Sequence, residues 1–244
     1  MTTNVHHIAR RLLAVDSRWS IDMRKHERPK IIFMDDVPYQ KIVTTEKHIA
    51  MFAGYANVMQ EWKLAICVAS YTGMYSFRKL PTKGIALLLL DASSGDVLYK
   101  LQHNAIEKEA SFAGTGAKAA KDCWPQCRDA IEVIEKEKKT DPCTGGTVRY
   151  YDYETKTGTL GIDGPYNAYN QMFSTMGNVI YFDDQSKVVP IADAAASDNS
   201  IHKAINDIQA GLISAAAPFE GMDQDISDEE KEHLFSSLEA IFAR

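Results

Sequence analysis

The sequence predicts an α+β fold, a four-layer αββα sandwich with helices outside and two sheets within. The chain opens with short paired strands, and its later elements come in runs: strands, helices, strands, helices, strands. A third observation is an apolar run at Ile85–Leu90, suited to a strand buried on both faces. A parallel fold would alternate single strands with helices, so this order argues against one.

The first third of the chain is predicted to form strand pairs. Residues 4–9 and 12–15 form two short strands joined tightly, and the polar, charged stretch 22–30 is expected to be an exposed loop. A strand follows, and then a second pair with alternating apolar positions. These three strands are expected at 30–34, 40–44 and 48–52.

The middle of the chain contains the expected helices. Gly54 ends the strand pattern, and a helix is predicted over 55–70 because its apolar residues recur on one face. After the apolar strand, residues 93–96 form a turn. One or two helices follow over 118–139, with a join at Trp124–Pro125 because the residue before proline avoids helical angles. The remaining strands are expected at 97–102, 111–113, 147–154 and 159–162.

Two regions are distinguished: a main domain at 1–163, and a mostly helical C-terminal extension at 164–244 packed on that domain or on a partner subunit. Ser227-x-x-Glu230 is a capping box, which predicts the start of a last helix at Asp228. The other elements expected in the extension are a loop at 166–171, strands at 179–182 and 188–191, and helices at 200–216 and 228–243.

Composition excludes several classes of function. The net charge of −6 comes without a basic stripe, so nucleic-acid binding is not expected. Arg10 and Arg11 interrupt any signal-peptide core, and the longest apolar run is too short to span a bilayer, which favours a cytoplasmic protein. The cysteines have no zinc spacing, so we expect reduced thiols and neither metal nor cofactor. They are Cys67, Cys123, Cys127 and Cys143.

The candidate chemistry begins at Thr2. If Met1 is removed, Thr2 carries a hydroxyl nucleophile and an amine base in one residue. A terminal amine has a pKa near neutrality and can take the hydroxyl proton at pH 7. Two further motifs supply a carboxylate and a carboxylate–hydroxyl pair that could hold the Thr2 amine and hydroxyl in place. They are Val15-Asp16-Ser17-Arg18 and Asp141-Pro142-Cys143-Thr144-Gly145-Gly146.

Taken in order, these motifs resemble the proteasome-type N-terminal-nucleophile (Ntn) hydrolases. The resemblance runs over roughly 2–155 and is greatest to the bacterial two-ring proteasome-like peptidases, whose chains also begin Met-Thr-Thr. The segments that carry it are Thr2-Thr3, Leu12 to Arg18, Lys41-Ile42-Val43, His48 to Gly54, Phe112 to Gly116 and Asp141 to Gly146.

The resemblance implies a role for each matched residue. Thr2 would be the nucleophile, and Asp16 would pair with a buried lysine, for which Lys41 is the first choice and Lys30 the competitor. Asp141 and Thr144 would orient the Thr2 amine. The implied catalytic residues are Thr2, Asp16, Lys41, Thr115, Asp141 and Thr144. Each also has a purely structural interpretation, as a strand-end, cap or solvated edge residue.

The implied substrate site is a groove that an extended peptide would enter as an added strand. Gly54 would donate its backbone N–H to the oxyanion. Ser20 and Ala56 would line the groove. The implied substrate-binding residues are therefore Ser20, Gly54 and Ala56.

The chain also departs from the family's pattern. The first hairpin is about two residues shorter than the family's, and the charged insert 22–30 is unusual. A one-residue deletion is needed near 44–46 to align Lys41. Only 72–83 separates the first long helix from the next strand, so the family's second long helix has no counterpart.

Two functions follow from this comparison. The first is an N-terminal threonine peptidase or amidase that cleaves an extended peptide or protein substrate, forms a homo-oligomer and works with an ATPase or other protein partner. The alternative is a catalytically inactive proteasome-like fold that acts as a protein-binding module, of the inhibitor or immunity type. Retention of five polar residues in order favours the first, and the missing helix and the insert favour the second.

Overall fold

The computed structural model describes residues 2–102 and 105–243. Within that part of the chain it is an α+β protein with two large antiparallel sheets, as the sequence predicts. The smaller sheet has the strand order β12-β11-β2-β1-β10-β9. Its strands are β1 (Asn4–His7), β2 (Leu12–Val15), β9 (Ala105–Ile106), β10 (Ala110–Ala113), β11 (Arg149–Asp152) and β12 (Thr157–Gly158).

The larger sheet has the order β14-β13-β4-β3-β15-β6-β7-β8, with β5 paired to β6. Its members come from both ends of the chain. They are β3 (Trp19–Met23), β4 (Lys30–Met34), β5 (Ile42–Thr44), β6 (His48–Tyr55), β7 (Ile85–Asp91), β8 (Val97–Leu101), β13 (Asn178–Tyr181), β14 (Asp184–Pro190) and β15 (Ala216–Ala217).

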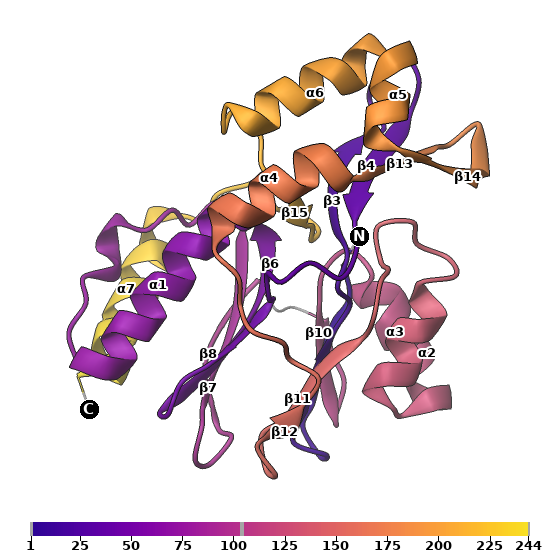
Figure 1. Ribbon diagram of the computed structural model, residues 1–244. Coiled ribbons are helices and arrows are strands. Elements are labelled where there is room, and N and C mark those ends of the chain that lie inside the picture. Colours follow the sequence, from indigo (N-terminus) through magenta and orange to yellow (C-terminus); the bar gives the residue numbers. More distant parts are fainter. Residues whose placement is uncertain (1, 103–104, 244) are drawn as a thin grey trace.

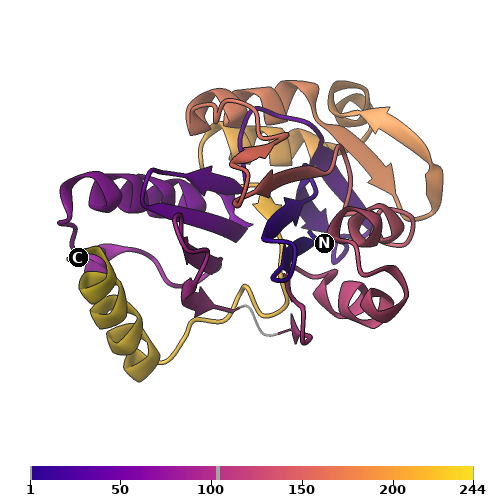
Figure 2. The same cartoon turned by 90° about the horizontal axis from the view of Figure 1, so that it is seen from below.

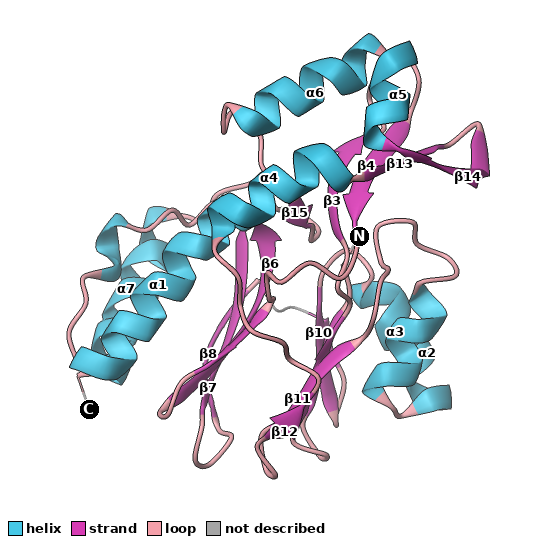
Figure 3. Ribbon diagram, viewed as in Figure 1, coloured by secondary structure: helices cyan, strands magenta, loops and turns pink. Residues whose placement is uncertain are grey.

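Helices cover the outer faces of both sheets (Figures 1 and 3). The helices α1 and α7 lie outside the larger sheet, and α2 and α3 lie outside the smaller one, on the opposite side of the molecule (Figure 2). The helices are α1 (Ala56–Thr72), η1 (Phe77–Lys79), α2 (Ala117–Cys127), α3 (Ala130–Glu137), α4 (Tyr166–Met176), α5 (Ile191–Ser197), α6 (Asn199–Gln209) and α7 (Asp228–Phe242).

Apolar side chains fill each space between these layers. On β7, Leu87 and Leu89 pack toward the helices outside the larger sheet, whereas Leu88 and Leu90 pack with residues of the smaller sheet such as Leu13. This alternation has a period of two, as side chains on a strand must. The unbroken apolar run is therefore buried on both faces, as predicted. A separate cluster, which includes Val5, Phe112, Trp124 and Ile134, lies between the smaller sheet and its helices.

Residues 164–243 contribute strands to the larger sheet as well as helices that cover it. β13 pairs with β4, and β15 lies between β3 and β6. The last helix begins at Asp228 behind the expected capping box, in which Ser227 and Glu230 bond each other's backbone. That prediction is confirmed.

Several predicted elements differ from the structure. No strand forms at 159–162, because Thr157 and Gly158 make the pairing with β11 instead. Residues 166–171 are not a loop, because α4 begins at Tyr166. The join between α2 and α3 lies at Arg128, not at Trp124–Pro125, and Trp124 packs against His7 and Phe112 while the helix passes through Pro125. Tertiary packing here outweighs the conformational bias of a residue before proline.

The helix predicted over 200–216 is too long. It ends at Gln209, and Gly211 follows with a φ of +70°, which favours glycine. Ala216 and Ala217 then form a strand between two others. Alanine prefers helices, so its partners in the sheet, rather than its own propensity, decide this conformation.

Buried His6 makes stability depend on pH. Burial, with smaller contributions from Lys100 and His7, lowers the pKa of His6 from 6.5 to about 4. Between those values the unfolded chain binds more protons than the folded protein, so stability falls as the pH falls. We expect His6 to account for a loss of roughly 3 kcal/mol in the free energy of unfolding over this window, read by urea denaturation at several pH values.

The His6→Gln variant should show a shallower dependence of unfolding free energy on pH than the wild type. His26→Gln changes an exposed histidine of the β3–β4 loop and serves as the control. Equal slopes in the wild type and His6→Gln would contradict the assignment.

Candidate functional site

The first hairpin brings Thr2 and Asp16 together. β1 and β2 pair antiparallel with Asn4 opposite Val15, so the residues before β1 and after β2 meet at one end. The Asp16 backbone N–H donates to the Thr3 carbonyl at 3.3 Å, which extends this pairing. Gly114 allows a close approach on the other side, because a Cβ there would lie 1.9 Å from the Thr2 carbonyl oxygen.

Thr2, Asp16 and Lys41 form one buried cluster. The Thr2 hydroxyl donates to Asp16 Oδ1 at 2.5 Å, and Lys41 Nζ donates to that same carboxylate oxygen at 3.0 Å. Lys41 Nζ also donates to Thr2 Oγ1. Lys41 comes from the segment before β5, where its carbonyl accepts the Phe52 N–H at 2.8 Å. A hydroxyl, an ammonium and a carboxylate are thus in mutual contact.

The Asp16 carboxylate is fully buried and heavily hydrogen-bonded. Backbone N–H groups of Thr3, Arg18 and Gly145 donate to it at 3.0, 3.1 and 3.3 Å. Burial of a charge is costly unless hydrogen bonds and an opposite charge replace water. Asp16 obtains both, and so it can hold Lys41 in place.

The lysine of the cluster is Lys41 and not Lys30. Lys30 is also buried, but its ammonium donates to Asp198 at 2.5 Å and to Ser200 at 2.7 Å. Burial lowers the pKa of Lys41 despite the opposing effect of Asp16. A lowered pKa increases the neutral fraction of the amine, which suits a group that accepts and returns a proton.

Asp141 and Thr144 form a second polar group beside the first. The Thr144 hydroxyl donates to Asp141 Oδ2 at 2.5 Å and lies 3.2 Å from Thr3 Oγ1. Burial raises the pKa of Asp141, and Cys143 N–H donates to its other oxygen at 3.0 Å. The pair therefore contacts the N-terminal strand through Thr3, a residue that motif reasoning did not single out as part of the site.

Arg18 fixes the loop that carries this pair. Its guanidinium forms two hydrogen bonds to Asp35, at 2.8 and 2.7 Å, and a third to the Pro142 carbonyl at 2.6 Å. A bidentate arginine–carboxylate pair is geometrically specific. The sequence shows Arg18 directly after Asp16 and Ser17, but it does not show that Asp35 lies opposite.

Thr115 lies on the other side of Thr2. Its N–H and hydroxyl donate to the Pro218 carbonyl at 3.0 and 3.3 Å, and the Thr2 N–H donates to that same oxygen at 3.3 Å. A depression of about 200 Å³ adjoins this point and is lined in part by Thr115, Phe219 and Glu220. Nothing in the sequence had indicated Pro218.

The three residues expected to flank a substrate groove do flank an extended segment, but it belongs to the same chain. Ser20 lies opposite Ala216 and Gly54 opposite Ala217, and the Ala56 N–H donates to the Ala215 carbonyl at 2.9 Å. Gly54 has a φ of +133°, and a Cβ there would lie 2.0 Å from the Gly84 carbonyl oxygen, so no larger residue fits.

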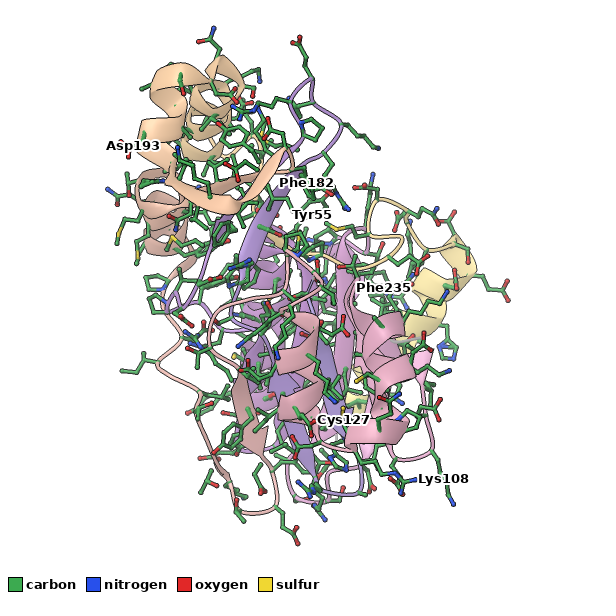
Figure 4. The ribbon with its side chains drawn as sticks, turned by 90° about the vertical axis from the view of Figure 1, so that its right-hand side faces the viewer. Tyr55, Lys108, Cys127, Phe182, Asp193 and Phe235 are labelled. Atoms are coloured by element: carbon green, nitrogen blue, oxygen red, sulfur yellow. The ribbon has the colours of Figure 1, made fainter. Side chains whose placement is uncertain are left out.

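The next two features are the cysteines, as candidate metal ligands, and the helices, as candidate membrane spans. Cys123 and Cys127 lie one turn apart on α2 with their sulfurs 3.2 Å apart (Cys127 is labelled in Figure 4). Among residues 2–102 and 105–243, no group of three or more His, Cys, Asp or Glu side chains is placed to hold a metal ion. No helix in this part of the chain is long and apolar enough to cross a bilayer.

The sequence was compared with protein-family models and with curated proteins, and neither comparison identified a relative. No protein-family model matches the chain, and no curated protein matches it significantly.

Removing the Asp16 charge should destabilise the protein. Asp16→Asn would leave the Lys41 ammonium buried without its counter-charge, and loss of one partner of a buried pair costs about 3 kcal/mol or more. We expect the urea-unfolding free energy at pH 7 to fall by that amount.

Asp183→Asn is the matched control, because Asp183 pairs with Arg28 at the surface, where both side chains are more than half exposed. Its loss should cost less than about 1 kcal/mol. Similar losses in the two variants would refute a dominant role for the Asp16–Lys41 pair in stability.

Proposed function

We propose that this protein is an N-terminal threonine hydrolase of the proteasome type, a peptidase or amidase activated by removal of Met1. The observation that supports the proposal best is the contact of the Thr2 hydroxyl with both Lys41 and Asp16. A threonine hydroxyl is a poor nucleophile unless a base lies within hydrogen-bonding reach. Here both an amine base and an oriented lysine are supplied.

The first half of the reaction would acylate Thr2. After the Met1–Thr2 bond is hydrolysed, the Thr2 hydroxyl passes its proton to the new α-amine, directly or through Lys41, and its oxygen attacks the substrate carbonyl carbon. The C–N bond of the tetrahedral intermediate then breaks, and the leaving amine takes the proton from the Thr2 ammonium. The acyl group stays on Thr2 Oγ1 as an ester.

Water completes the cycle. It attacks the ester carbonyl, the α-amine accepts its proton, and the Thr2 hydroxyl is restored as the acid product leaves. Hydrogen-bond donors for a substrate carbonyl lie beside the nucleophile, since the Thr115 N–H and hydroxyl both donate to the Pro218 carbonyl. Such donors stabilise charge that develops on a substrate oxygen. Gly54 remains the donor that the family resemblance implies.

The proposed substrate is an extended peptide or a protein segment, held by strand addition between β3 and β6. A homo-oligomer, an ATPase or other protein partner and a cytoplasmic location belong to the same proposal, through the resemblance alone.

One observation favours the alternative, an inactive fold used as a protein-binding module. Thr2 is fully buried, and the groove beside it is already filled by residues 215–217. A nucleophile in this arrangement cannot reach a substrate until its surroundings move.

A covalent probe distinguishes the two functions. Purified protein is treated with a threonine-reactive epoxyketone or β-lactone, and its intact mass is measured. We expect the loss of one methionine residue and one probe adduct that Thr2→Ala abolishes. Lys41→Met should slow labelling by about 100-fold or more, because the hydroxyl loses a partner in proton transfer.

Lys63→Met is the matched control. Lys63 is another buried lysine, bound to Asp163 at 3.0 Å, and burial lowers its pKa to about 8. This variant should label at the wild-type rate. A retained Met1 with no adduct in any variant would support the binding-module function.

A further inference from the structure

A two-residue strand occupies the centre of the larger sheet. β15 lies between β3 and β6, labelled together near the N-terminus in Figure 1, and it joins the two halves of the sheet. Strands usually have at least three residues, and alanine is a poor strand former. A central position held by Ala216 and Ala217 is therefore weakly specified by its own sequence, and it resembles a gap filled by a short inserted segment.

The segment binds as an extended ligand would. It is antiparallel to both neighbours, so the facing edges of β3 and β6 each pair with it. Ser20, directly opposite Ala216, is buried, and its hydroxyl has no hydrogen-bond partner among the described residues. The Ser20 hydroxyl is therefore available to hydrogen-bond a different occupant of this position.

The same segment also covers Thr2, the candidate nucleophile. The Pro218 carbonyl accepts hydrogen bonds from the Thr115 N–H and hydroxyl, as a substrate carbonyl would, and it also accepts the Thr2 amide N–H. Phe219 is buried beside Ala53 and Ala86, at one wall of the depression next to Thr115. The segment thus has an apolar anchor directly after the carbonyl that meets the site.

In the first part of the connection from α6 to α7, residues 210–221, burial is confined to one short stretch. Ala215, Ala216, Ala217 and Phe219 are buried, whereas residues 210–212 and 220–221 on either side are exposed. Each flank contains a glycine at positive φ, Gly211 and Gly221. Past the second, the Tyr55 hydroxyl donates to Asp223 at 2.7 Å in an exposed contact (Tyr55 is labelled in Figure 4). Exposed flanks let a buried segment leave without unfolding its neighbours.

We propose that residues 215–219, Ala-Ala-Ala-Pro-Phe, are a tethered pseudosubstrate that occludes the groove until a substrate or partner displaces it. The proposal rests on the proposed hydrolase function. The tether gives the segment a high effective concentration, so a free peptide competes only for the open fraction of molecules. The preferred substrates have small residues opposite Ser20 and Gly54 and a large apolar residue in the place of Phe219.

Loosening the anchor should expose Thr2. Phe219→Ala removes the buried side chain that holds the segment, and we expect epoxyketone labelling of Thr2 to accelerate at least about 10-fold. The matched control is Phe235→Ala on α7, which removes an equally buried phenylalanine from the main core (Phe235 is labelled in Figure 4). It should label at the wild-type rate.

A milder variant covers the case in which Phe219→Ala does not fold. Asp223→Ala removes only the exposed hydrogen bond from Tyr55. It should accelerate labelling by about twofold to fivefold, since one exposed hydrogen bond contributes little.

A second readout does not depend on catalysis. A fluorescent peptide with the sequence of residues 213–221 is titrated into each protein, and its anisotropy is measured. It should bind Phe219→Ala and slow its labelling, but not bind the wild type. The same peptide carrying Phe219→Asp should not bind.

The outcomes separate the two proposals. Faster labelling together with peptide binding supports both. Equal labelling of the wild type and Phe219→Ala, without peptide binding, overturns the pseudosubstrate and leaves the hydrolase. Peptide binding to Phe219→Ala without labelling of any protein supports the occluded groove and overturns the hydrolase. Neither labelling nor binding overturns both.

Discussion

The buried ion pair between Asp16 and Lys41 is the interaction on which the site depends. Asp16 follows a strand of the smaller sheet, and Lys41 precedes a strand of the larger one, so the pair joins the two sheets beside Thr2, just before the chain's first strand. Three backbone N–H groups complete the shell of Asp16. Because an incomplete shell would leave a buried charge uncompensated, the hairpin, the Lys41 segment and the 141–146 loop must all be in position together.

The second constraint is the central gap of the larger sheet. Unpaired edges of β3 and β6 would leave backbone groups without partners, and a short extended segment satisfies them whatever its side chains are. The chain fills the gap with its own residues 215–217, at the entrance to the Thr2 cluster. In the proposed hydrolase, the same few residues would both complete the sheet and control access to Thr2.

Much of the fold follows from local pattern. The apolar run of β7, the amphipathic α1 and the capping box at Ser227 each predict an element that the structure contains, because burial on one or two faces and helix capping act over a few residues. The pattern failed where distant residues decide. Trp124 is held in helical geometry by packing on His7 and Phe112, and Ala216 is taken from a predicted helix into a sheet.

The sequence by itself determined the α+β class, and its resemblance to the Ntn hydrolases singled out the candidate residues Thr2, Asp16, Lys41, Asp141 and Thr144, because residue type and order along the chain carry that resemblance. Only the tertiary structure decided that Lys41 rather than Lys30 contacts Asp16, that Thr3 connects the Asp141–Thr144 pair to the first strand, and that Ala216 and Ala217 pair between β3 and β6. These contacts join residues that are 14 to more than 200 positions apart in the sequence. Local propensity acts over a few residues and does not encode such contacts.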